Sequence, residues 1–116
     1  MRFLSMVRIN ENSGMQPSEK LMHDMGKLLE EVTKAGVMLD TAGLRPTSEG
    51  VRLRLAHGKI SVVEGPFTET KEVVGGYAMM ETKTMDEAIH WTKRFLMVHG
   101  EEWDITCEVR QLDEHR

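Results

Sequence analysis

The first segment of the chain, residues 2–10, constrains the fold more than any other feature, because it carries apolar side chains at both odd and even positions. Successive strand residues point to opposite faces of a sheet. The apolar residues here occupy both faces, with Phe3, Val7 and Ile9 on one and Leu4 and Met6 on the other. This pattern is typical of a strand that is covered on two sides. The fold must therefore supply a packing layer for each face.

Two segments have the apolar spacing of an amphipathic helix, residues 18–36 and residues 84–100. Ser18 is a suitable N-cap for the first helix, and Gly36 suits the left-handed turn that ends it. Thr84 and Glu87 form a capping-box pair at the start of the second helix.

The other apolar segments predict strands. A second strand begins at residues 37–39, a hairpin covers 51–64 with its turn at Gly58, and two more strands cover 73–82 and 105–110. With the first strand and the two helices, this order is the ferredoxin-like split βαβ pattern with an inserted β-hairpin. We therefore predict one α+β domain over residues 1–116.

Helices in a ferredoxin-like domain cover one face of the sheet, so the second face of the first strand needs another cover. A second copy of the chain can supply that cover through the same sheet face. We therefore expect a twofold homodimer in which the two sheets pack against each other.

Charge and composition argue against several classes of partner. The formal net charge is -4 and the basic residues are scattered, which disfavours nucleic acid. No apolar run approaches the roughly 18 residues that cross a bilayer, so we expect no membrane partner. The single cysteine, Cys107, fits a reducing compartment and a cytoplasmic protein. It also lacks partners for a zinc or iron–sulfur site, and no nucleotide-binding motif occurs, so we expect no metal and no cofactor.

The strongest local motif runs from Glu64 to Glu72 and reads Glu-Gly-Pro-Phe-Thr-Glu-Thr-Lys-Glu, followed by Gly-Gly-Tyr at residues 75–77. Its Gly-Pro pair fixes a sharp change of chain direction, because proline locks φ and glycine tolerates angles that other residues avoid. We favour this architectural interpretation. In the alternative, Glu64 transfers protons and the neighbouring residues bind a ligand. The ligand-binding candidates are Gly65, Pro66, Phe67, Glu69, Lys71, Gly75 and Gly76.

Other polar residues also have a functional and a structural interpretation. The guanidinium groups of Arg45, Arg52 and Arg54 suit a small anionic ligand, although solvated surface positions explain them more simply. Asp40, Tyr77 and His23 are further candidates for acid–base catalysis. Their structural alternatives are a loop cap for Asp40, a core aromatic for Tyr77 and a solvent-facing position for His23, which lies off the apolar stripe of its helix.

The motif at residues 64–77 resembles the signature of the DGPF-domain branch of the YCII-related family, which is similar to Asp-Gly-Pro-Phe-x-Glu-Thr-Lys-Glu followed by Gly-Gly-aromatic. The resemblance extends over most of the chain and implies a dimeric α+β barrel. Glu64 stands where the signature has aspartate. The family resemblance also implies a histidine general base on the first helix, about eleven residues before its final glycine. The corresponding residue here is Met25.

Two functions therefore stay open. The first is a small-molecule-binding accessory or regulatory module, a context that the resemblance implies because such members are often encoded beside sigma factors. The second is a cofactor-independent enzyme, such as an isomerase, dehydrochlorinase or lyase, acting on a small aromatic or lactone compound. In either case we expect a pocket between sheet and helices, lined by methionines. We call residues 64–72 the signature loop. An enzyme would need this loop and at least two ionisable side chains at that pocket.

Overall fold

The computed structural model describes residues 1–68 and 71–114. Its elements follow the predicted order: β1 (Arg2–Ile9), α1 (Glu19–Lys34), β2 (Met38–Gly43), β3 (Val51–Ala56), β4 (Lys59–Glu64), β5 (Val73–Glu81), α2 (Met85–Met97) and β6 (Thr106–Gln111). A short 3-10 turn, η1 (Thr47–Glu49), precedes the hairpin. In the part of the chain that the structure describes, no helix has both the length and the apolarity needed to cross a bilayer.

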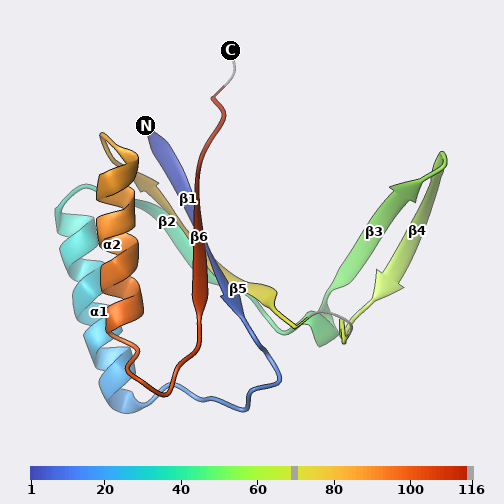
Figure 1. The fold of residues 1–116 in the computed structure, drawn as a ribbon, viewed down its shortest axis with the longest axis horizontal. Coiled ribbons are helices and arrows are strands. Elements are labelled where there is room, and N and C mark those ends of the chain that lie inside the picture. The colour runs from blue at the N-terminus through green and yellow to red at the C-terminus, as the bar shows by residue number, and fades with distance from the viewer. Residues whose placement is uncertain (69–70, 115–116) are drawn as a thin grey trace.

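Four strands form one antiparallel sheet in the order β2-β5-β1-β6. Both helices lie on the same side of this sheet (Figure 1). The strand order and the one-sided helix layer confirm the predicted ferredoxin-like α+β fold, with the hairpin β3–β4 inserted between β2 and β5.

The core lies between the sheet and the two helices. Phe3 of β1 is completely buried there, and it pairs across the sheet with Met80 of β5. The helices contribute Leu28, Val32 and Ala88 to the same cluster. An ion pair between Arg94 and Glu31 joins α2 to α1 at the surface.

The predicted helix ends are confirmed by their hydrogen bonds. The Ser18 hydroxyl accepts a hydrogen bond from the Leu21 amide at 3.1 Å, and the Thr84 hydroxyl accepts one from the Glu87 amide at 3.2 Å. Gly36 follows α1 with φ of +73°, the left-handed conformation expected after a helix.

The second face of the sheet carries no described helix or strand. Alternation along β1 places Leu4, Met6 and Arg8 there, opposite the buried Phe3. Tyr77 and Met79 of β5, and Glu108 and Arg110 of β6, pair with these residues and so lie on the same face. We call this surface the open face. We predicted that both faces of β1 need a cover. In the structure the helices cover one face, and the apolar residues of the open face are half-buried.

The hairpin projects away from the sheet (Figure 1). His57 and Gly58 both have positive φ, which gives the two-residue turn that suits a twisted hairpin. One face of the hairpin is aliphatic and largely exposed, and consists of Val51, Leu53, Leu55, Ile60 and Val62. The other face carries Arg52 and Arg54.

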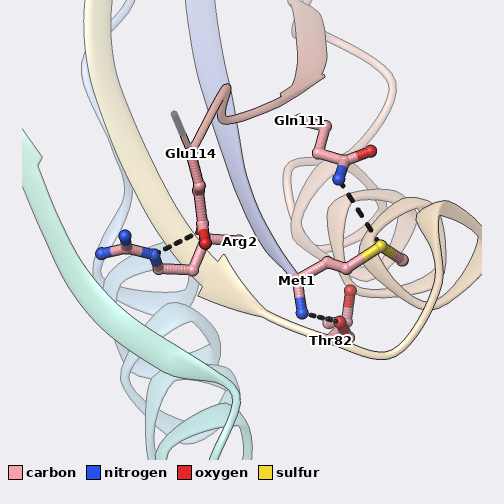
Figure 2. A network of polar contacts seen from close by, with 5 residues as sticks. All are labelled: Met1, Arg2, Thr82, Gln111 and Glu114. Atoms are coloured by element: carbon pink, nitrogen blue, oxygen red, sulfur yellow. Dashed lines mark hydrogen bonds and ion pairs between the residues drawn. The ribbon is translucent and has the colours of Figure 1, made fainter. Parts of the chain in front are cut away.

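Hydrogen bonds join the start of the chain to the segments that follow β5 and β6. The Met1 amino group donates a hydrogen bond to the Thr82 carbonyl oxygen at 3.0 Å, and Arg2 Nε donates one to Glu114 Oε1 at 2.7 Å (Figure 2). Gln111 Nε2 lies 3.5 Å from Met1 Sδ. These contacts hold β1 and the segment after β6 together.

Candidate functional site

A cavity of about 280 Å³ lies between the helix layer and the sheet. Residues of α1 and α2 line it on the helix side, and residues of β1, β2 and β5 line it on the sheet side. The apolar lining includes three methionines from three elements, together with two aromatic rings of α2: Met25, Met38, Met80, Trp91 and Phe95. The pocket predicted between sheet and helices is therefore present, and methionines line it.

The cavity wall contains no charged side chain among the described residues. Its buried hydroxyls belong to Ser5 of β1 and Thr92 of α2, which are 4% and 8% exposed. Thr92 Oγ1 donates a hydrogen bond to the Ala88 carbonyl oxygen at 2.9 Å and lies 3.5 Å from Ser5 Oγ. Burial raises the pKa of the neighbouring Cys107 thiol, and a hydrogen bond with Ser5 partly offsets that rise.

Three glycines, Gly43, Gly75 and Gly76, line part of the cavity. A Cβ at Gly75 would lie 2.5 Å from Ile9 Cδ1, and one at Gly76 would lie 3.0 Å from the Ala42 carbonyl oxygen. Both glycines thus allow a close approach, at the point where the pairing of β1 with β5 shifts register. Gly43 differs, since a Cβ there would have no heavy atom nearer than 4.0 Å.

The structure brings two catalytic candidates, Tyr77 and Asp40, together on the open face, and Tyr77 also contributes to the cavity lining. The Tyr77 hydroxyl donates a hydrogen bond to Asp40 Oδ2 at 3.1 Å. A shift in the pairing of β2 with β5 between Met38 and Asp40 turns Asp40 to this face, while Met38 stays on the cavity side. The hydrogen bond to Asp40, reinforced by the carboxylate charge, raises the pKa of Tyr77 above its ordinary value.

This hydrogen bond predicts a measurable pH dependence. Tyr77 is the only tyrosine of the chain, so absorbance near 295 nm reports its ionisation alone. We expect a midpoint above pH 10 for the folded protein, and a lower midpoint in Asp40→Asn. Since the folded pKa exceeds the unfolded one, the bond stabilises the fold below about pH 10, and this contribution is lost as pH rises through the folded pKa. Identical midpoints in both proteins would contradict the contact.

A second depression, of about 550 Å³, lies at the base of the hairpin and is more open. Three predicted ligand-binding residues line it, namely Arg45, Arg52 and Phe67, together with Arg8 and Arg110 of the open face. Arg52 Cζ lies 3.9 Å from the centre of the Phe67 ring. Carboxylates already pair with several of these arginines: Glu49 with Arg45 at 2.8 Å, and Glu108 with Arg8 at 3.8 Å.

The signature loop contributes Phe67 to this depression and is hydrogen-bonded to the chain segment before the hairpin. Gly65 and Pro66 are linked by a cis peptide bond, and the Gly65 amide donates to the Gly50 carbonyl oxygen at 2.9 Å. The Phe67 amide donates to Thr47 Oγ1 at 3.1 Å, and that hydroxyl in turn donates to Glu11 Oε1 at 2.8 Å. Gly65 and Phe67 thus hold the loop against the segment around η1, and none of its described residues, 64–68 and 71–72, lines the cavity.

The remaining candidates are dispersed. Glu64 lies exposed at the end of β4, and Arg54 lies exposed in the middle of β3. His23 is exposed on α1, and Lys71 is exposed before β5. Glu69 lies outside the described residues. The described residues also contain no group of three side chains of the metal-binding types that could hold an ion.

Sequence reasoning missed the polar wall of the cavity. Ser5 and Thr92, which line the cavity, come from elements far apart in the chain, and each one fits its local pattern as an ordinary strand or helix residue. One feature of the sequence could have indicated these residues: a serine and a threonine occupy positions in otherwise apolar stripes.

Comparison with known proteins gives a consistent assignment. A family model described as the YCII-related domain matches residues 1–101, which include both helices, the hairpin and all strands except β6. An uncharacterised protein of Rhizobium meliloti (strain 1021) is 31% identical over 78 residues, or 67% of this chain. The match spans 63% of that relative's length. Because the family model covers most of its residues, this chain belongs to the YCII-related family.

Proposed function

We propose that this protein is a binding module for a small, uncharged and mainly apolar molecule, which it holds in the cavity between sheet and helices. The observation that carries the proposal is the lining of that cavity, which is apolar apart from a few hydroxyls and has no charged side chain among the described residues. Binding sites for small molecules have this composition, with few polar groups in a mostly apolar wall.

The size of the cavity fits a ligand of one or two rings. Apolar cavities of roughly 150 Å³ already bind benzene. The present cavity is larger, at about 280 Å³, and its methionine side chains can adapt to the shape of a ligand.

The placement of ionisable groups favours binding over acid–base catalysis at this cavity. Met25 lines the wall at the position where the family resemblance implies a histidine. The hydroxyl of Tyr77 is engaged by Asp40 on the opposite face of the sheet. None of residues 64–68 and 71–72, the described part of the signature loop, lines the cavity, so these residues supply no proton donor or acceptor to a ligand there.

We also propose that a second copy of the chain covers the open face. The centre of this face consists of Leu4, Met6, Tyr77 and Met79, which lie next to one another in the register of β1 and β5. Charges of both signs surround them, because Arg8 and Arg110 lie near Glu108. A face with an apolar centre and mixed charges at its rim can pair with itself around a twofold axis.

Toluene and selective ¹³C labelling of the methionine methyl groups test the binding proposal. We expect toluene to shift the signals of Met25, Met38 and Met80, which line the cavity, and to leave those of the exposed Met22 and Met97 unchanged. In Gly43→Leu, the new side chain should occupy the cavity and weaken toluene binding at least roughly tenfold, equivalent to about 1.4 kcal/mol.

Gly26→Leu is the matched control, because Gly26 lies in α1 with open space around it and outside the cavity lining. It should bind toluene like the wild-type protein. The proposal is wrong if toluene shifts none of the three cavity methyl signals, or if the two leucine variants bind it equally well.

A further inference from the structure

The cavity has one buried polar point, formed by the hydroxyls of Ser5 and Thr92. These two residues and Thr82 are the buried polar residues of the described chain. Thr82 is satisfied, because its hydroxyl donates to the Thr84 carbonyl oxygen at 2.8 Å. Ser5 and Thr92 differ from it in lining a cavity that can admit a ligand.

The hydrogen bonds at this point leave the Ser5 hydroxyl with unused capacity. Thr92 has one hydroxyl proton, and the Ala88 carbonyl oxygen at 2.9 Å accepts it. The Ser5 and Thr92 oxygens are 3.5 Å apart, beyond the range of about 2.5–3.0 Å for an O–H···O bond. The other partner of Ser5 is the Cys107 thiol, and sulfur is a weak donor and acceptor.

The partners of the Ser5 hydroxyl are a distant hydroxyl and a weak thiol, so a ligand that offers it a short hydrogen bond gains the free energy of that bond. The group that supplies it must be neutral. A carboxylate or ammonium group would lose its hydration in a wall where no described side chain carries a counter-charge.

We propose that the ligand carries one neutral hydroxyl or carbonyl group on an apolar body, and that this group hydrogen-bonds to Ser5. Phenols, small ketones and lactones belong to this chemical class. The inference rests on the proposed binding function and deepens it by naming the class of ligand. Ser5 acts here as the residue that orients the ligand and selects for its polar group.

Two probes that differ by a single hydroxyl, toluene and p-cresol, separate the polar anchor from apolar binding. We expect Ser5→Ala to weaken p-cresol binding at least tenfold and to change toluene binding less than twofold. Ser61→Ala is the matched control, because it makes the same substitution on the exposed hairpin, and it should change neither affinity. The charged analogue p-toluate should bind the wild-type protein at least a hundredfold more weakly than p-cresol.

Each result bears on the inference. If Ser5→Ala weakens both neutral probes equally, or if p-toluate binds as well as p-cresol, the polar anchor is wrong while the binding function stands. If neither neutral probe binds the wild-type protein, the binding function itself is wrong. Should Ser5→Ala fail to fold, Ser5→Cys keeps the side-chain volume close to that of serine and replaces the hydroxyl with a weak hydrogen-bonding group. It should then show the same selective loss of p-cresol binding.

Discussion

Replacing Gly65 with alanine is expected to destabilise the protein by about 2–4 kcal/mol, as expected for a severe steric change at a packed site. A Cβ at this position would lie 1.6 Å from the Thr47 carbonyl oxygen and 2.6 Å from its carbonyl carbon. Both are backbone atoms, so no side-chain rotation can relieve the overlap. The loop must move away from η1, which breaks the hydrogen bonds from the Gly65 and Phe67 amides.

Urea unfolding measures this effect, and Gly50→Ala is the control from the facing loop. A Cβ at Gly50 would lie 3.6 Å from the same Thr47 oxygen, which is an ordinary contact. That variant should stay within about 0.5 kcal/mol of the wild-type protein. Equal unfolding free energies for the two variants would show that the signature loop does not need glycine for this close approach.

Replacing Met6 with lysine is expected to raise the dissociation constant of the proposed dimer by roughly three orders of magnitude, equivalent to about 4 kcal/mol. Met6 lies at the centre of the open face, between Tyr77 and Glu108 in the sheet register. The side chain points away from the helices, so the fold of each protomer should survive. In a twofold interface, each dimer would bury two new ammonium groups that carry a large desolvation cost.

Sedimentation velocity over a range of concentrations checks this prediction. The wild-type protein should sediment at twice the 13.2 kDa chain mass and the variant at the mass of one chain. Met22→Lys is the control, since Met22 is 64% exposed on α1, far from the open face in the fold. A wild-type protein that sediments as a single chain at every concentration, or a Met6→Lys variant that sediments like wild type, would exclude this interface.

Local signals were sufficient to predict the helices and the hairpin. Ser18, Thr84 and Gly36 act at helix ends through contacts within a few residues, so the pattern contains all the information needed. The extent of β2 was harder to predict. The sequence indicated only where this strand begins, at residues 37–39. Pairing with β5, a partner distant in the chain, extends the strand to Gly43.

The candidate site was less predictable, because it depends on contacts between distant segments. The functional interpretation of the motif, which was the less favoured one, would place Glu64 beside Gly75 and Gly76. The structure places Glu64 at the end of β4 and the two glycines against Ile9 and Ala42. The network that holds the signature loop runs through Glu11 and Thr47, which no local pattern connects to Phe67. The shift in strand pairing that separates Asp40 from the cavity also leaves no trace in the composition of β2.

The aliphatic face of the hairpin creates a risk of non-native association. An exposed two-stranded ribbon with unpaired edges is a template on which identical ribbons can stack. Arg52, Arg54 and Lys59 lie on the reverse face of the same ribbon and give it a positive charge. Like charges on stacked copies of the hairpin would repel one another, so we expect these three residues to oppose such association.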